Sequence, residues 1–242
     1  MSSFVYTRSE LTRTFRNYRF FVFSLGFPLA LYFLIAGPNR HEDILGIPLP
    51  LYFMTGMMAF STMIAVVSSG GRIAAERQLG WNRQLRITPL RAPAYLSAKV
   101  LSGYAMAASS ILLIGLAGTI VGVRLTVGEW ATLVVLILIG LIPFAGMGIA
   151  IGHLVSVDSL GPLMGGLTSI LALLGGAWGP IATSGALHTV SEAMPSYWLV
   201  QAGKTAIGGS VWPLTGWLVI AAWSVAMAAL AAWAYRRDTG KA

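Results

Sequence analysis

Six long stretches of the chain contain no Asp, Glu, Lys or Arg, and they alternate with shorter segments that carry the charges. They are residues 20–39, 44–71, 100–123, 130–157, 159–191 and 205–235. A helix crosses the hydrocarbon core of a bilayer with about 20 apolar residues, because each residue rises about 1.5 Å and lipid offers the backbone no hydrogen-bond partner. The pattern therefore predicts an all-α membrane protein with six transmembrane helices.

We expect a single transmembrane domain over residues 1–242. Its predicted spans are residues 20–37, 51–69, 100–123, 130–153, 161–180 and 213–235. Pro28 predicts a kink in the first span. Residues 181–212 are Gly-rich and weakly polar and include Trp198 and Trp212, which predicts an external segment or a re-entrant hairpin with aromatic side chains at headgroup depth.

The few charges, 10% of residues, are distributed unevenly. Thirteen basic residues lie in three segments: before the first span, between spans two and three, and after span six. The opposite side has three, Arg40, Arg124 and Lys204. Basic residues are retained on the cytoplasmic side of a membrane. We therefore expect a multi-pass protein with both termini in the cytoplasm, and we assign the net charge of +8 to this rule rather than to nucleic-acid binding.

The N-terminal segment, residues 1–19, predicts an amphipathic helix over residues 4–19. Leu11, Phe15, Tyr18 and Val22 recur at helical spacing, with arginines around them. Such a helix lies on the membrane surface. The alternative is a disordered basic leader.

Candidate catalytic groups are scarce. The predicted spans contain no charged residue, which disfavours an ion-coupled carrier. His153 lies at the end of span four, and His41 and His188 lack metal-ligand spacing. Gly203-Lys204-Thr205 lacks the first glycine of a nucleotide-binding loop, since Trp198 stands there. We therefore expect no catalytic, metal or cofactor site in this chain.

The segment between spans two and three, residues 70–98, is more informative. Residues 72–88 predict an amphipathic helix with Ile73, Trp81 and Leu85 on one face, and Thr88-Pro89 ends it. Such a tethered helix either lies on lipid or docks into a groove of a cytosolic partner.

This segment resembles the signature of ABC type-2 export permeases, E-R-x-x-G-[TW]-x-x-x-L-x-x-T-P-L. The residues at the fixed positions are Glu76, Arg77, Gly80, Trp81, Leu85, Thr88, Pro89 and Leu90. The similarity extends over the whole chain: an amphipathic N-terminal helix, six spans, a small-residue-rich fifth span, and an external segment with Pro195, Tyr197 and Trp198.

The resemblance implies the transmembrane subunit of an ATP-driven exporter in the bacterial plasma membrane. It implies a second permease subunit, identical or paralogous, and a separate cytosolic ATPase that binds ATP and Mg. Residues 72–88 become the coupling helix, with Glu76, Arg77, Gly80, Trp81 and Leu85 as ATPase-coupling residues. Glu76 and Arg77 are expected to make charged contacts with the ATPase, and Trp81 and Leu85 to provide its packed anchor.

The resemblance also implies a substrate path near the dimer interface, lined largely by spans one, two and five. We expect Phe27, Phe33, Gly165, Gly166 and Ser169 to line it. The chain is most similar to daunorubicin-type drug exporters, and its uncharged spans favour a hydrophobic or amphipathic, antibiotic-like substrate. The alternatives are export of a polysaccharide or lipid-linked glycan, and a membrane immunity or sensor protein outside ABC transport.

Overall fold

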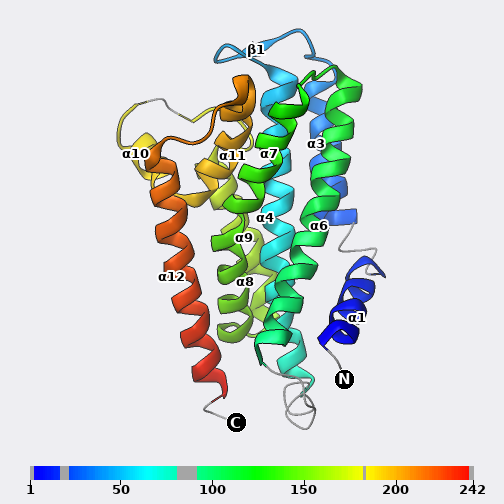
Figure 1. Cartoon of the computed structure of the whole chain (residues 1–242), viewed down its shortest axis with the longest axis vertical. Coiled ribbons are helices and arrows are strands. Elements are labelled where there is room, and N and C mark those ends of the chain that lie inside the picture. The colour runs from blue at the N-terminus through cyan, green and yellow to red at the C-terminus, as the bar shows by residue number, and fades with distance from the viewer. Residues whose placement is uncertain (1–2, 17–21, 81–91, 182–183, 240–242) are drawn as a thin grey trace.

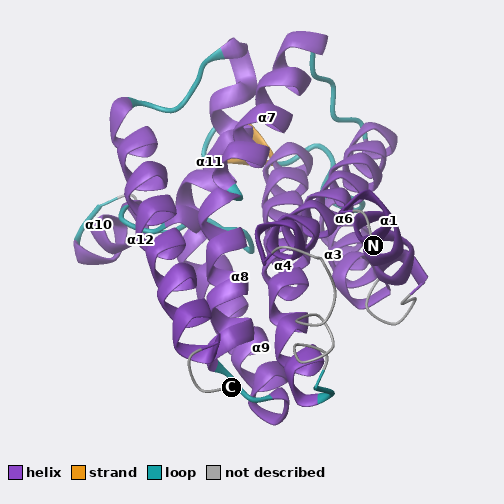
Figure 2. Cartoon of the chain, turned by 60° about the horizontal axis from the view of Figure 1, so that its bottom comes forward, coloured by secondary structure: helices purple, strands orange, loops and turns teal. Residues whose placement is uncertain are grey.

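The computed structural model describes residues 3–16, 22–80, 92–181 and 184–239. Almost all of them are helical, and within these ranges the strands are confined to a single hairpin (Figure 2). The helices of the first half are α1 (Ser3–Arg16), the π-helix η1 (Val22–Gly26), α3 (Phe27–Ala36), α4 (Leu49–Gln78) and α6 (Ala92–Val121). Those of the second half are α7 (Val127–Gly140), α8 (Ile142–Leu154), α9 (Val157–Gly175), α10 (Ala186–Glu192), α11 (Pro195–Ala206), η2 (Ile207–Gly209) and α12 (Leu214–Thr239).

Five described helical segments are long and apolar enough to cross a membrane. They are Leu49–Gln78, Pro93–Val121, Val127–Leu154, Val157–Gly175 and Leu214–Asp238. The first predicted span is shorter in the described residues, an apolar helix over Ser24–Ala36. Residues 17–21, where that span was expected to begin, lie outside the described part. The chain is a multi-pass helical membrane protein, and the sixth crossing stays a prediction.

The predicted kink at Pro28 coincides with a change of helix type. The π-helix η1 ends at Gly26, and α3 begins one residue before Pro28. A proline ring clashes with the carbonyl of the fourth residue before it, and a wider turn relieves such a clash. The change from η1 to α3 therefore lies where the proline requires it.

Helix α4 forms the centre of the bundle and packs against α3, α6, α8, α9 and α11 (Figure 1). Its apolar window is 89% buried, whereas those of α9 and α12 are 17% buried. The backbones of α4 and α8 approach each other closely. A Cβ on Gly70 would collide with the backbone of Gly148, and one on Gly148 would lie 2.5 Å from the carbonyl oxygen of Val67. The spaced small residues of span four therefore allow backbone contact between the two helices, as such residues do in lipid.

The structure corrects the expected division between span two and a separate coupling helix. Span two was expected to end at Ser69, but α4 continues without a break to Gln78. Gly70 and Gly71 do not interrupt it, because Gly70 packs on α8 and Gly71 faces Leu160 of α9. Residues 72–78 of the predicted coupling helix therefore form the last turns of the central helix. Residues 81–88 lie outside the described residues.

Other boundaries differ from the prediction for local reasons. α9 ends at Gly175, because Gly176 adopts φ +74° and closes the helix with a left-handed residue. The fourth span consists of α7 and α8, which meet at Leu141 just before Pro143. The loop after α3, which was expected to be external, forms a hairpin in which Asp43–Ile44 pairs with Ile47–Pro48. Leu45 and Gly46 both have positive φ there, as a type I′ turn requires.

The segment expected to be external is folded against the bundle. α10 lies at its side, and α11 packs against α4, α7 and α9 near the upper end in Figure 1. Trp198, Leu199 and Ala202 of α11 are buried. Gly203 makes this approach possible, because a Cβ there would collide with Thr55 of α4. This part of the chain is thus a pair of short helices built into the bundle.

Candidate functional site

The polar residues of the bundle gather at its lower end in Figure 1. Both termini lie at this end, together with α1, the end of α4, the start of α6 and the end of α8. Of the thirteen basic residues assigned to one side of the membrane, the eight in described positions belong to these elements and to the end of α12. They are Arg8, Arg13, Arg16, Arg72, Arg77, Lys99, Arg236 and Arg237. The three basic residues of the opposite side belong to the upper end: Arg40 follows α3, Arg124 follows α6, and Lys204 lies in α11.

Lys99 is the centre of a buried ionic cluster that joins α1, α4 and α6. Its side chain is 1% exposed, and Nζ lies 2.7 Å from Oε1 of Glu10 and also contacts Glu76. The hydroxyl of Tyr95 donates a hydrogen bond of 2.5 Å to Oε2 of Glu76. A buried charge is costly unless it is paired and hydrogen-bonded. Each charge at this junction has a partner of opposite sign from a different helix.

Arg72 extends the same cluster toward α6. Its guanidinium donates hydrogen bonds to the hydroxyls of Thr14, at 2.8 Å, and Ser69, at 3.3 Å. The Ser69 hydroxyl lies 2.7 Å from that of Ser102 and donates to the carbonyl oxygen of Lys99 at 2.6 Å. The network therefore couples the position of α1 to the register between α4 and α6.

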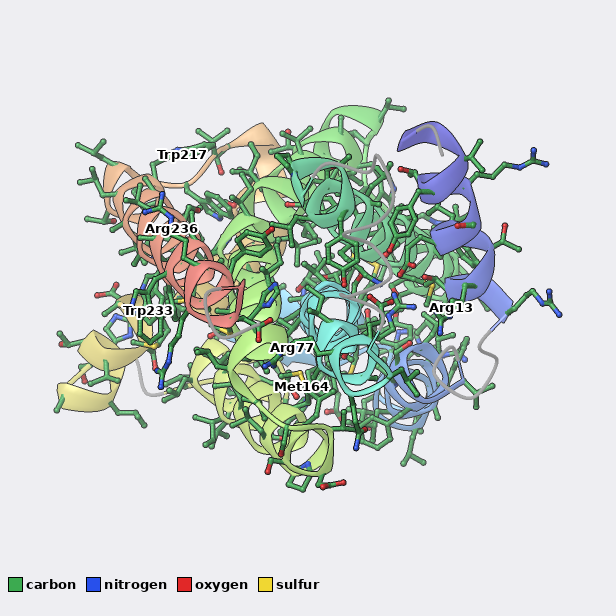
Figure 3. All side chains as sticks on the ribbon, turned by 90° about the horizontal axis from the view of Figure 1, so that it is seen from below. Arg13, Arg77, Met164, Trp217, Trp233 and Arg236 are labelled. Atoms are coloured by element: carbon green, nitrogen blue, oxygen red, sulfur yellow. The ribbon has the colours of Figure 1, made fainter. Side chains whose placement is uncertain are left out.

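Helix α1 contacts the bundle through a face that the sequence analysis did not single out. Tyr6, Glu10 and Thr14, spaced by four residues, are buried, and the Tyr6 ring lies 5.9 Å from that of Tyr95. On the expected apolar face, Phe15 is 45% exposed. Seen from below, α1 runs across the view while α4 is seen nearly end-on (Figure 3). The helix thus docks by its polar side and presents apolar residues outward.

A second ionic group joins α4 to α8 and α12. Nη2 of Arg77 lies 2.7 Å from Oδ1 of Asp238, and Nη1 donates to the carbonyl oxygen of Gly152 at 3.2 Å. Figure 3 shows Arg77 between α4 and the green α8. Nδ1 of His153 lies 2.9 Å from Oδ2 of Asp238. A carboxylate only accepts, so Nδ1 carries the proton in this contact.

Glu76 and Arg77 therefore connect the lower end of α4 to four other helices, α1 and α6 through Glu76 and α8 and α12 through Arg77. Glu76 was expected to reach an ATPase subunit, but it is 5% exposed and held within the chain. Arg77 is more open, with 29% of its side chain exposed. Their contact with a partner stays a prediction.

Gly80 ends the described part of the signature and has a clear local role. It adopts φ +70°, and its N–H donates to the carbonyl oxygen of Arg77 at 3.0 Å. A left-handed residue after the last turn is the common way to end a helix, and glycine adopts it without strain. Trp81 and Leu85 follow in residues outside the described part.

The predicted path residues lie on open faces of α3 and α9. Phe27 and Phe33 are 51% and 43% exposed. Cβ atoms added to Gly165 and Gly166 would meet nothing within 4 Å, and Ser169 is half-buried one turn further on. Within the described part of the chain, these two glycines therefore make no close packing contact. Within the described residues, each group lies on an exposed face of its own helix.

Lys204 was set aside as part of a false nucleotide motif, and the structure gives it another environment. It lies within α11, with Nζ 5.1 Å from the centre of the Tyr52 ring. Burial lowers the pKa of Lys204. Its neighbourhood is a helix interface rather than a glycine-rich loop.

Sequence reasoning missed both ionic groups, although signals for them were present. Lys99 directly precedes the predicted third span in the sequence, and the structure places it fully buried within α6. A four-residue spacing of Tyr6, Glu10 and Thr14 indicated a second, polar face of α1. Asp238 stood out as the single acidic residue after span six. None of these signals identified the partner residue.

Comparison with known proteins agrees with this architecture. The family described as "ABC-2 type transporter" matches residues 2–207. The chain is also 30% identical over 192 residues to a Bacillus subtilis (strain 168) protein named "Putative transport permease YvfS", and this similarity covers 78% of each chain. The family match extends from the N-terminal helix through α11, so it includes Lys99 and its two ionic partners, Glu10 and Glu76. This membrane protein therefore belongs to the ABC-2 type transporter family.

Proposed function

We propose that this chain is the transmembrane subunit of an ATP-driven exporter and that it carries a hydrophobic or amphipathic substrate out of the cell. The observation that supports this function best is the family match over residues 2–207, joined to a bundle whose basic residues gather at one end. On the positive-inside rule that end is cytoplasmic, with both termini. The chain then requires a separate ATPase subunit and a second permease subunit.

The coupling role is supported by the continuity of α4. The helix has 30 residues, about 45 Å at 1.5 Å per residue, and runs from the upper end of the bundle to the signature segment. A force applied just after Gln78 would act on the most buried helix of the protein. In this proposal Trp81 and Leu85 contact the ATPase, while Glu76 and Arg77 hold the end of α4 in place for that contact.

The proposed path follows from the open faces of α3 and α9. Both expose apolar or small residues along the height of the bundle, including Phe27, Phe33 and Gly165. Small residues allow close approach of a second helix in lipid. We place the second permease subunit against these faces, with the substrate between them. The exposed surface is apolar, which favours a drug- or antibiotic-like substrate over a charged one.

The test is reconstitution. The chain, a candidate ABC ATPase and liposomes are combined, and ATP hydrolysis and substrate export are measured together. Trp81→Ala is expected to lower export per ATP hydrolysed by about tenfold or more, since truncation of an anchoring aromatic costs about 2 kcal/mol. Trp233→Ala, at an exposed tryptophan of α12, is the matched control. An unchanged ratio for Trp81→Ala would contradict the coupling role.

A further inference from the structure

A groove of about 790 Å³ lies between α1 and the lower end of α4. Four arginines line it, Arg8, Arg13 and Arg16 from α1 and Arg72 from α4, together with the carboxylates of Glu10 and Glu76. Ligand pockets usually have volumes of about 300–1,000 Å³. The groove is therefore large enough for a small ligand or for the headgroup of a lipid.

The lining of the groove carries more positive than negative charge. Glu10 and Glu76 are the two acidic residues of its lining, and both are in contact with Lys99 behind the groove wall. The arginines outnumber them, and Arg13 is 63% exposed with Nη1 3.7 Å from Oε1 of Glu76. Figure 3 shows Arg13 between α1 and α4. An anion in the groove would meet guanidinium groups whose neighbouring carboxylates are already paired.

The lining is also partly apolar, which narrows the class of ligand. Val5 and Leu79 line the groove and are 50% and 75% exposed. Phe15 is exposed on the same short helix. An inorganic anion or an acidic peptide would use the arginines and leave these side chains in water. A phospholipid carries a phosphate beside its acyl chains and would use both.

We propose that this groove binds the phosphate headgroup of an anionic phospholipid from the adjacent leaflet. Guanidinium groups bind phosphate oxygens through paired hydrogen bonds, and basic pockets between membrane helices recognise anionic headgroups in this way. A lipid bound there would hold α1 against α4 from outside, opposite the Lys99 cluster that joins them from inside. The site involves this chain alone and does not depend on the substrate or on the ATPase.

The test measures lipid binding by the purified, delipidated full chain in detergent. Native mass spectrometry would follow titration with phosphatidylglycerol, with phosphatidylcholine as the zwitterionic comparison and inorganic phosphate as competitor. We expect phosphatidylglycerol to bind preferentially. Arg8→Gln combined with Arg13→Gln should weaken it about tenfold or more, because each basic residue contributes a severalfold gain in affinity for anionic lipid. Both side chains are exposed, so the fold should persist, and the thermal unfolding midpoint would verify this.

The matched control is Arg236→Gln combined with Arg237→Gln. It removes the same charge from the same end of the protein, but on α12, across the bundle from α1 (Figure 3). Phosphatidylglycerol should bind this variant like the wild type. An equal loss of phosphatidylglycerol binding in both double variants would show that surface charge alone accounts for the binding, and it would overturn the proposal. So would equal binding of phosphatidylcholine, full competition by millimolar phosphate, or unchanged phosphatidylglycerol binding in the Arg8→Gln and Arg13→Gln double variant.

Discussion

Arg77 and Asp238 form an ion pair of 2.7 Å that ties the central helix α4 to the last helix of the chain. Asp238 also accepts from His153 of α8, so one carboxylate holds three helix ends together. Glu76, the neighbour of Arg77 in the signature, joins α4 to α6 by its contact with Lys99, and Lys99 in turn contacts Glu10 of α1. Two adjacent residues thus fix the lower end of α4 within the bundle.

Asp238→Asn should loosen the end of α12. The side chains of Arg77 and Asp238 are 29% and 16% exposed. Because water screens such a pair, its loss is expected to lower the free energy of unfolding by about 1 kcal/mol. Hydrogen exchange should rise in the last turns of α12 and α4. The charge swap, Arg77→Asp with Asp238→Arg, should recover part of the protection. Recovery stays incomplete because aspartate cannot donate to the carbonyl oxygen of Gly152. Unchanged exchange in Asp238→Asn would show that the pair does not hold α12.

Lys99→Met should destabilise the protein strongly. It leaves the buried carboxylates of Glu10 and Glu76 without their shared cation, a change that costs about 3–5 kcal/mol in buried pairs. The thermal unfolding midpoint in detergent should fall well below that of the wild type. Adding Glu10→Gln and Glu76→Gln should restore much of it, since the charges are then removed together. Arg124→Met, at an exposed residue, is the control, and equal midpoints for Lys99→Met and this control would refute the role of the cluster.

Gly148→Val and Gly165→Val should behave differently. A Cβ at Gly148 would lie 2.5 Å from the carbonyl oxygen of Val67, whereas one at Gly165 would meet nothing within 4 Å. We expect Gly148→Val to reduce the yield of folded protein severalfold. Gly165→Val should leave folded yield intact and lower export per folded molecule. Gel filtration of detergent extracts gives the yield, and a reduced yield for Gly165→Val would instead assign that glycine to packing.

Phe27→Ala and Phe33→Ala should alter export more than a change of equal exposure elsewhere. Both rings lie on the open face of α3, where we place the path. Ala226→Leu, on an exposed face of α12, serves as the comparison. Export normalised to folded protein is the measurement. Equal effects at all three positions would remove α3 from the path.

Probes for orientation should label two distinct groups of positions. Tags at both ends and a cysteine at Asn82 should react from the cytoplasm, and cysteines at His41 and His188 from outside. The uneven distribution of basic residues is the reason. The chain has no native cysteine, so each introduced thiol is unique. External labelling at Asn82 would reverse the orientation and the coupling proposal with it.

The helices could be predicted from the sequence because the absence of charge over about 20 residues is a local property. The end of span two could not. Gly70-Gly71 suggests a break when the local sequence is considered alone, but the neighbouring backbones of α8 and the side chains of α9 keep α4 helical through it. Tertiary packing determines where α4 ends, and the local sequence alone does not show which segments pack against it.

The ionic groups were beyond prediction for a related reason. Lys99 and Glu10 are far apart in the sequence, and nothing in the periodicity of α6 indicates that α1 docks beside it. A lone lysine at the edge of an apolar run is usually interfacial, because long basic side chains reach toward water. Here docking of α1 covers it. The role of Gly165 in a substrate path stays a prediction, and its open environment among the described residues could not be inferred from the sequence.

The contact of α4 with α8 at Gly70 and Gly148 restricts where the protein can deform. With backbones touching, a slide of one helix along the other would force Val67 or Ile149 into the opposite main chain. The pair must therefore pivot as one rigid unit. The remaining freedom lies at the junction of α7 and α8 at Leu141 and in α9, whose apolar window is only 17% buried. A force applied at the signature segment would then tilt α4 and α8 together. The tilt would widen one side of the bundle at its upper end without disturbing the contact at its centre.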